Sequence, residues 1–487
     1  MRFGNNIFDP QVFKRSCIVL VVVMLLQKFT GGAGYALLLP AILMSITQRN
    51  PEKQIFWILL TITMMMGNGY FMPKGAVFYI ANRLVLGVFG LVGFMQLAGQ
   101  RKSPLVTPFL GLIIYLLYMF IPSQFGYSPI ISNLKLILFI VVFIAYFGAA
   151  NTVMSSRSVD VRKMRAMLLA MASFFIIGSV LVIPFPGISQ LSGLEYEEAV
   201  KSGQDLTSLF KGMTMHSQAL GPIICVVFTF LFADLVFNVR KWNGFYVFLL
   251  SFCPFLIYKT SSRAGMASFI LGIMFVGWCL MLDRKIGSRW RSQVMSKLWV
   301  IAILCVVAAV AVPGVRDGVV RFALKYNREA KAGDFTMEEA LLSRQSKMDM
   351  QMENFHRKPA IGNGFQVTAD MQGFRAKSVL SLLSAPVEKG VWVTAVLEEG
   401  GVLGFLIFST FVVICGFTLL SRKAYTALSC FFVLIVSNMA EMTMFSMSAM
   451  GGFFWALVFI GGAFDGVTQR NQKMRAVPMS PMGRRFF

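Results

Sequence analysis

The chain has 487 residues, of which 56% are hydrophobic and only 14% are charged, and its mean hydropathy is +0.69. Soluble domains are less apolar and carry almost twice this share of charged residues. Composition therefore excludes an ordinary soluble globular protein. Apolar runs of about 20 residues, the length that a membrane-spanning helix requires, recur from end to end.

The chain is also strongly basic, with 45 Lys and Arg residues against 22 Asp and Glu residues and a formal net charge of +23. Such an excess can indicate nucleic-acid binding, but no basic soluble domain is present to carry it. The positive-inside rule, which collects basic residues in short cytoplasmic loops, explains the charge better. We therefore expect a membrane-lipid environment and no nucleic-acid partner.

The seven cysteines each lie inside an apolar stretch, and none has a CxxC or Cys/His spacing. This pattern is typical of small buried side chains and not of disulfides or metal ligands. Only two histidines are present, which argues further against a histidine-based metal site. The sequence predicts no metal and no cofactor.

Hydropathy predicts an all-α polytopic membrane protein with about fourteen transmembrane helices. The expected spans are 17–29, 33–47, 55–72, 78–98, 105–121, 130–150, 166–184, 219–238, 243–258, 264–282, 298–314, 392–420, 424–440 and 447–466. The first two are short enough to form a tight hairpin around residues 31–34. The basic residues before the first span also fit a signal peptide, although the many later spans favour an uncleaved helix.

Counting the spans from a cytoplasmic N-terminus places on the cytoplasmic side the basic groups at 49–53, 101–102, 157–165, 240–241, 284–297 and 422–423 and those of the tail from Arg470. This map divides the chain into an N-terminal transmembrane bundle (1–184), a transmembrane core (185–314) that includes an outer loop (185–218), a large outer loop (315–391), C-terminal transmembrane helices (392–468) and a basic cytoplasmic tail (469–487) that we expect to be disordered. The large loop lies between the eleventh and twelfth spans.

The large loop should be partly helical. Thr336 and Glu339 form a capping box that predicts a helix over 337–357. Basic residues alternate with apolar ones over 319–328, a pattern typical of an amphipathic helix on the membrane surface. The segment 359–365 predicts a tight glycine turn, but it has neither the spacing nor the flanking strand of a nucleotide-binding loop.

Several candidate functional residues fall where spans begin on the outer face. A helix N-terminus suits anions because its first N–H groups are unpaired. Ser261 or Ser262 can cap the span at 264, which puts Arg263 at its positive end, where it can bind phosphate or extend to the lipid interface. His216, before the span at 219, can shuttle a proton or bind a sugar or pyrophosphate, or it is incidental beside a structural cap at Ser217.

A further group of charges lies at the start of the span near 392 and consists of Glu388, Lys389, Glu398 and Glu399. Carboxylates there are costly unless they are paired or hydrated. Each of them alone fits a structural role as well as a catalytic one.

Two more arginines belong to the outer side of the map. Arg83 lies about one turn inside its span, where it can line a cavity that opens at the outer face or lie at the lipid interface. Arg344 lies on the capped helix of the large loop. Both are candidates for binding an anion.

Together and in this order, four segments resemble the O-antigen ligase / O-antigen polymerase (Wzy) family of bacterial membrane proteins. They are Gly212 to Gly221, Ser262 to Gly272, Ser343-Arg344 followed by Gly362-x-Gly364, and Glu399-x-Gly401-Val402-Leu403-Gly404, and the resemblance covers roughly residues 200–470. It implies a large periplasmic loop over a cavity in the bacterial inner membrane. It also implies a glycan donor on undecaprenyl pyrophosphate and transfer without a nucleotide sugar or a metal.

The resemblance implies roles for individual residues. Arg263 and Arg344 would hold the pyrophosphate and stabilise the charge that develops as it leaves. Ligases of this family carry a His–Asn pair about nine residues before the last motif, but the matching position here is Gly390. Either Glu388 or Lys389 would then be the base, with His216 and Glu399 as the next candidates.

The missing histidine favours a polymerase of O-antigen or exopolysaccharide. The alternatives are a ligase that transfers the glycan onto lipid A core or another acceptor, and a lipid-linked glycan transporter or flippase without chemistry. The expected partners are the polyprenyl-linked donor, a growing glycan or lipid acceptor, and other polysaccharide-assembly proteins. A transporter would be expected to show repeated halves, which the sequence lacks, and broken helices.

Overall fold

The protein is described here by a computed structural model. The ranges that it describes are 7–47, 50–99, 103–105, 107–155, 159–190, 210–215, 217–260, 262–284, 286–311, 348–367, 389, 391–439, 442–446 and 450–476. Within these ranges every regular element is a helix, and the only extended pairing is a single bridge between Gly67 and Thr214. The prediction of an all-α fold is confirmed for this part of the chain.

Each predicted span lies largely within a helical segment. In chain order these are α1 (Pro10–Phe29), η1 and α2 (Gly34–Leu38, Leu39–Thr47), α3 (Pro51–Met66), α4 (Ala76–Gly99), η2, α5 and α6 (Thr107–Phe109, Leu110–Tyr118, Phe120–Phe125), α7 (Pro129–Ser155), α8 (Val161–Leu181), α11 with η4 (Ser217–Ala233, Asp234–Val239), α12 (Gly244–Lys259), α13 (Arg263–Leu282), α14 (Ser288–Ala311), α18 (Trp392–Ser421), α19 (Tyr425–Ser437) and α20 (Met450–Ala476). Eight helical segments of the described residues are long and apolar enough to cross a membrane. The count of fourteen crossings stays a prediction.

Local sequence explains where many of these helices begin. The side chains of Asp9, Asn50, Asn243 and Ser262 accept hydrogen bonds from the first-turn N–H groups of α1, α3, α12 and α13. Such caps satisfy donors that have no partner inside the helix. Proline follows the first two caps, at the position where its missing N–H costs nothing.

The expected hairpin between the first two spans is present. Gly31 and Gly32 have φ angles of 63° and 101°, a region that glycine enters without steric cost. A side chain at Gly34 would collide with the backbone of Leu26. The three glycines therefore let the chain reverse directly between α1 and η1.

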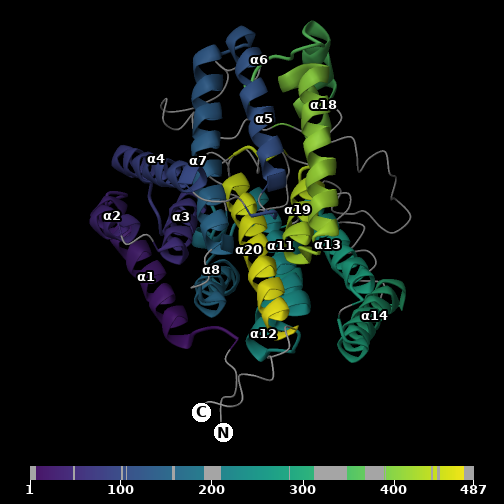
Figure 1. Ribbon diagram of the computed structural model, residues 1–487. Helices are drawn as coiled ribbons and strands as arrows, with labels where there is room; N and C mark the ends of the chain where they lie inside the picture. The colour runs from purple at the N-terminus through teal and green to yellow at the C-terminus, as the bar shows by residue number, and fades with distance from the viewer. Residues whose placement is uncertain are drawn as a thin grey trace, which may run out of the picture.

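The helices form a bundle around α11 and α20, which are buried along almost their whole apolar length. In Figure 1, α1 to α4 lie on one flank, and α13 and α14 lie on the other. Gly93 on α4 meets Gly148 on α7 so closely that a Cβ on either would strike the other helix's backbone. Small residues of this kind let apolar helices approach in a membrane.

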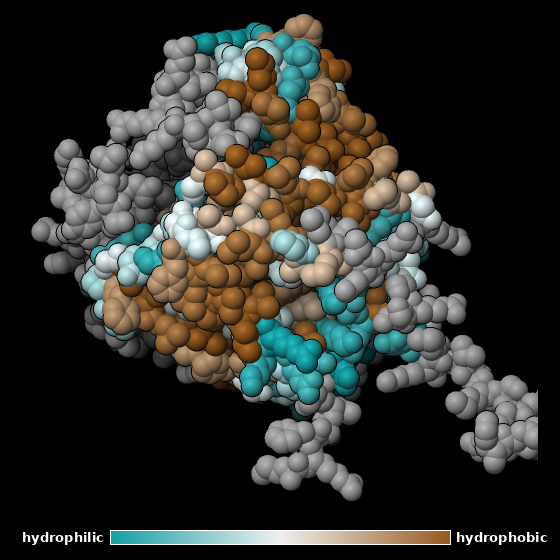
Figure 2. Space-filling view, turned by 90° about the vertical axis from the view of Figure 1, so that its left-hand side faces the viewer, coloured by the Kyte–Doolittle hydropathy of each residue, from teal (hydrophilic) through white to brown (hydrophobic). Residues whose placement is uncertain are grey.

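The outer surface of the bundle is apolar, as a lipid-facing surface should be. Phe417 and Val413 on α18 are 71% and 68% exposed, and Leu91 on α4 is 61% exposed. Figure 2 shows broad hydrophobic areas on the face it presents, with hydrophilic residues gathered toward the ends. These features are those of a multi-pass membrane protein.

The ends of the helices meet as the charge map requires. At one end, Asn238 donates to Thr426 and Asp465, and Arg470 donates to the carbonyl of Met154. The charge map assigned all of these positions to one side of the membrane. Gly221 and Ser262, which it assigned to the other side, also meet. Which side is cytoplasmic stays a prediction.

The expected disorder of the tail from residue 469 is wrong for its first part. Helix α20 continues to Ala476, because backbone hydrogen bonds inside a helix do not require apolar side chains once its first turns are anchored. Gln469 also donates to the carbonyls of Arg422 and Lys423. Residues 477–487 lie outside the described residues.

Candidate functional site

Helix α18 is interrupted at Gly401, whose backbone angles (φ 64°, ψ −168°) are not helical. Glycine is the residue that adopts such angles without strain. The 30-residue helix is thus two helices joined at a break, and the sequence 398–404 contains the glycines that allow it. A break inside an apolar helix leaves backbone groups that need new partners.

The glycine turn predicted at 359–365 supplies those partners. Asn363 and Gly364 donate their backbone N–H groups to the carbonyls of Glu398 and Glu399, at 2.9 and 3.0 Å. In return, Val402 donates its backbone N–H to the carbonyl of Pro359 at 2.8 Å. The turn is therefore fixed to the break by reciprocal hydrogen bonds.

Glycines make this close approach possible. A Cβ at Gly362 would collide with the backbone of Glu399, and a Cβ at Gly401 would collide with the backbone of Ala360. Gly126, just after α6, is packed equally tightly against the carbonyl of Asn363. The turn is thus enclosed between the α6–α7 connection and α18.

A buried cluster of charges lies beside this break. The ammonium of Lys389 lies 2.9 Å from Oε2 of Glu398 and 3.1 Å from Oε1 of Glu399. All three side chains are at least 95% buried. Lys389 is itself held by its carbonyl, which accepts a hydrogen bond from Met442. Three charges predicted on the same span end are therefore brought into one site.

The two neighbouring carboxylates have different environments. Both oxygens of Glu398 are hydrogen-bonded. Oε1 accepts a hydrogen bond from the Asn354 amide at 3.0 Å, and Oε2 accepts one from Lys389. Glu399 lies near Lys389 and the backbone N–H of Gln366, yet neither of its oxygens accepts a well-aligned hydrogen bond from the described residues. Buried polar atoms are rarely left without a hydrogen bond, and a catalytic role or a bound water is among the explanations for such an exception.

The helix over 348–357 and its flanks complete the site. Asn354 accepts from the Tyr127 hydroxyl at 3.1 Å, and Gln351 accepts from the Thr394 hydroxyl at 2.6 Å. The amide nitrogen of Gln351 has no partner among the described residues. The site thus offers a spare donor as well as the spare acceptors of Glu399.

A second lysine brings the charges of the site toward balance. Lys135 on α7 is 4% exposed and donates to the carbonyl of Gln366 at 3.1 Å, and it interacts electrostatically with Glu399. Two lysines then accompany two carboxylates. Because a charge buried without a counter-charge is very costly, this pairing lowers the cost of burying the two carboxylates.

The charge state of Lys389 follows from its neighbours. Burial by itself lowers the pKa of a lysine, but the carboxylates of Glu398 and Glu399 outweigh burial and hold the pKa of Lys389 above its ordinary value. Lys389 is therefore a permanent cation at neutral pH. It can stabilise negative charge, but it is a poor general base, which leaves Glu399 as the better candidate.

Of the predicted site residues, the structure brings Lys389 and Glu399 together. Glu388, His216 and Arg344 lie outside the described residues. Arg263 is the first residue of α13, directly after the Ser262 cap, and is half-buried. The segment 262–272, which contains Arg263, packs against the segment 212–221, since a Cβ at Gly221 would collide with the side chain of Ser262.

The second predicted anion-binding arginine, Arg83, lies on α4, where it interacts with Tyr79 one turn earlier on the same helix. Its assignment to pyrophosphate binding stays a prediction.

Lys135 and Asn354 were not predicted as site residues, and for Glu398 a structural and a catalytic role were both left open. A signal was present for Lys135, because a lysine inside an apolar span is itself a functional-site hypothesis. Nothing in the local sequence marked Asn354. Its role depends on a contact with Glu398, 44 residues away.

The described part of the chain is an α-helical protein of the multi-pass membrane class, with a buried ionic site at a broken helix. Comparison with protein-family models and with curated proteins finds no match.

Proposed function

We propose that the protein is a polysaccharide polymerase that transfers a glycan from a polyprenyl-pyrophosphate donor at the outer face of a bacterial inner membrane. The observation that supports this most is the buried Glu399 carboxylate, whose oxygens keep spare acceptor capacity next to Lys389. A glycosyl transfer between two hydroxyl-rich substrates needs such a group to receive a proton.

In this proposal an acceptor hydroxyl attacks the anomeric carbon of the donor sugar. A carbon–oxygen bond to the acceptor forms, and the bond between the anomeric carbon and the pyrophosphate oxygen breaks. The hydroxyl proton passes to Glu399, and the polyprenyl pyrophosphate leaves with its electron pair. General-base assistance of this kind contributes about 10²- to 10⁴-fold to a rate.

The other groups of the site have matching roles. The spare amide donor of Gln351 and the carboxylate of Glu399 suit a sugar hydroxyl, which both accepts and donates hydrogen bonds. Lys389 keeps Glu399 ionised and ready to receive the proton. Arg263, at the positive end of α13, remains the candidate for the leaving pyrophosphate, because a guanidinium pairs with phosphate oxygens through two parallel bonds.

A transporter is the second candidate, and the break in α18 is the observation that favours it, since transporters build ion sites at broken helices. Here, however, the backbone groups near the break are paired with the 359–364 turn. They are therefore not open to an ion. A ligase would use the same chemistry as a polymerase with a different acceptor.

The proposal can be tested with purified protein in lipid vesicles and a polyprenyl-pyrophosphate-linked oligosaccharide, with products separated by length. We expect longer polyprenyl-linked glycans with wild-type protein and none with Glu399→Gln. Glu353→Gln is the matched control, because Glu353 is an exposed carboxylate on the neighbouring 348–357 helix. Product that appears only when lipid A core is added would indicate a ligase.

Donor that crosses the vesicle membrane without any change in length would indicate a transporter. A Glu399→Gln protein as active as wild type would remove the carboxylate from the chemistry and overturn the assignment of the site.

A further inference from the structure

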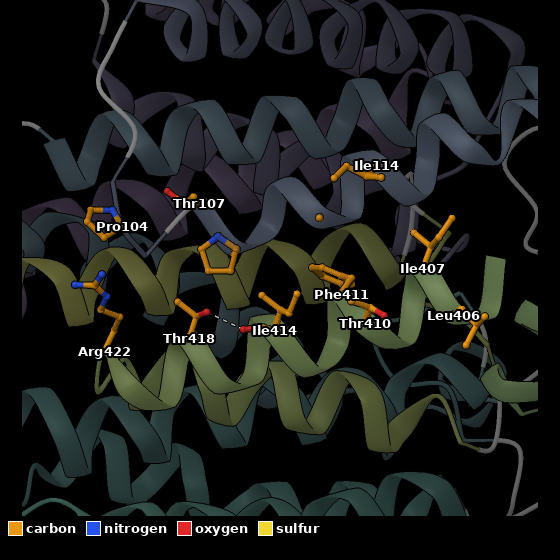
Figure 3. A pocket seen from close by; sticks show the side chains of 12 residues that line it. Pro104, Thr107, Ile114, Leu406, Ile407, Thr410, Phe411, Ile414, Thr418 and Arg422 are labelled. Carbon is orange, nitrogen blue, oxygen red and sulfur yellow. Dashed lines mark hydrogen bonds between the residues drawn. The ribbon is translucent and has the colours of Figure 1, made fainter. Parts of the chain in front are cut away.

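An apolar groove runs along the membrane-facing side of α5 and α18 (Figure 3). It has a volume of about 700 Å³ and is lined chiefly by aliphatic and aromatic side chains. Ile114 on α5 and Leu406 on α18, both in its wall, are 62% and 55% exposed. Figure 3 shows Leu406 at one end of the groove and Arg422 at the other, near Pro104.

A polar pocket shares a lining residue with the groove. This second cavity has a volume of about 500 Å³ and lies where η4, the α18–α19 connection and α20 meet. Arg422 lines both cavities. An apolar groove and a polar pocket that share one arginine have the chemistry of a site for an amphiphile.

The charges of the polar pocket favour an anion. Its two carboxylates are already engaged, since Asp283 lies 3.8 Å from Lys423 and Asp465 accepts backbone hydrogen bonds from Thr426 and Ala427 at the start of α19. Arg240 and Arg422 also line the pocket, and neither forms an ion pair with a carboxylate among the described residues. The pocket therefore keeps an excess of positive charge.

We propose that these two cavities form a binding site for an anionic phospholipid, with one acyl chain in the groove between α5 and α18 and the headgroup phosphate at Arg422. Basic pockets between transmembrane helices are typical sites for anionic headgroups. Leu406 and Arg422 are separated by about 24 Å of helix at 1.5 Å per residue. This exceeds one leaflet of a hydrocarbon core about 30 Å thick, so the groove can hold an acyl chain.

The site is separate from the charge cluster. Glu399 lies near the opposite end of α18, beyond the break, so the headgroup would lie in the other leaflet from the Lys389 cluster. The groove is therefore a lipid site and not the place of the glycan donor. The proposal does not depend on the proposed function, because it concerns binding and not transfer.

The test is native mass spectrometry of purified protein titrated with phosphatidylglycerol, and separately with phosphatidylcholine, polyprenyl phosphate and inorganic phosphate. We expect one phosphatidylglycerol per chain, held in preference to the zwitterionic lipid. Arg422→Gln should weaken it about 10- to 100-fold, since hydrogen bonds to charged groups contribute about 1.5–3 kcal/mol. Arg357→Gln, at an exposed arginine of the 348–357 helix, is the control for charge.

A second pair of variants tests the groove. Thr410→Trp fills it from the α18 wall and should also release the lipid, while Val413→Trp, at an exposed position outside the groove, should not. Unchanged retention in both Arg422→Gln and Thr410→Trp would overturn the proposal. Inorganic phosphate that competes fully would show a free-anion site, and preference for polyprenyl phosphate would show a donor site; either result would overturn it as well.

Discussion

Two buried ionic clusters among the described residues differ in how completely their polar atoms are paired. Arg165 on α8 meets Asp234 through two parallel hydrogen bonds of 2.8 and 2.9 Å. The Tyr246 hydroxyl donates to the same carboxylate at 2.7 Å, and the carbonyl of Ile7 accepts from Arg165 at 2.9 Å. Both carboxylate oxygens of this cluster are therefore hydrogen-bonded.

The cluster at the break in α18 is different. Glu398 is satisfied, but Glu399 next to it is only near its counter-charge and accepts no well-aligned hydrogen bond from the described residues. A fully satisfied network rigidifies a core, whereas a carboxylate oxygen without a hydrogen bond can still accept one from a ligand. This difference supports a stabilising role for the Arg165–Asp234 cluster and the proposed catalytic role for the Lys389–Glu399 cluster.

The largest expected effect separates the two clusters by activity. Glu399→Gln should lower glycan transfer by about 10²- to 10⁴-fold, because the amide cannot accept the proton. Thermal unfolding in detergent should change much less than in a variant of Asp234, since the amide has the same shape and Glu398 still pairs Lys389. A large loss of stability with little loss of transfer per folded molecule would reverse the assignment.

The next effect is on stability. Asp234→Asn should lower the free energy of unfolding by about 3–5 kcal/mol, because it leaves Arg165 buried without its counter-charge. The measurement is the unfolding midpoint at equal expression. The double variant Arg165→Met with Asp234→Leu should recover most of the loss, and failure to recover would show that the pair does more than satisfy its own charges.

Arg263 belongs to neither cluster and extends the comparison to the outer helix ends. If it holds the leaving pyrophosphate, Arg263→Lys should lower transfer by about 10- to 100-fold, nearly as much as Arg263→Ala, because lysine lacks the paired donors of a guanidinium. Folding should be unchanged. Lys259 is the control, because it is a cation near the same helix end that forms a cation–π contact with Phe255. Lys259→Gln should remain active.

The break itself should matter for stability. Gly401→Ala places a Cβ against the backbone of Ala360 at a positive φ, which should cost about 1–3 kcal/mol of strain. Gly416 on the same helix has open space at its Cβ position, so Gly416→Ala should be neutral or slightly stabilising. Similar unfolding midpoints for the two variants would show that the turn does not depend on this approach.

The smallest effect is on pH dependence. The pKa of Lys389 is raised by its carboxylates, so its contribution to stability is fully present below the ordinary lysine pKa of about 10.4 and is lost as pH rises through the higher folded value. Unfolding midpoints should therefore show no Lys389-dependent change between about pH 7 and pH 9. A wild-type transition in that range that disappears in Lys389→Met would contradict the charge state proposed here.

Much of the architecture followed from local sequence. Spans and their caps depend on neighbouring residues, so hydropathy located the helical segments, and Ser262 was expected as one of two alternative caps for α13. The charge map grouped helix ends correctly because basic residues distribute by side of the membrane along the whole chain. The same local reasoning failed at residues 469–476, where a helix anchored in the bundle continues through polar sequence.

What only the tertiary structure decided is which charges are paired. By sequence alone, Glu398 and Glu399 are equivalent neighbours, and Lys135 is a single cation in an apolar span. Their difference arises because the 348–367 segment delivers Asn354 to Glu398 and not to Glu399, and because α7 brings Lys135 to the same place. Hydrogen bonding and burial depend on contacts between distant segments, so the fold alone distinguishes a satisfied carboxylate from an available one.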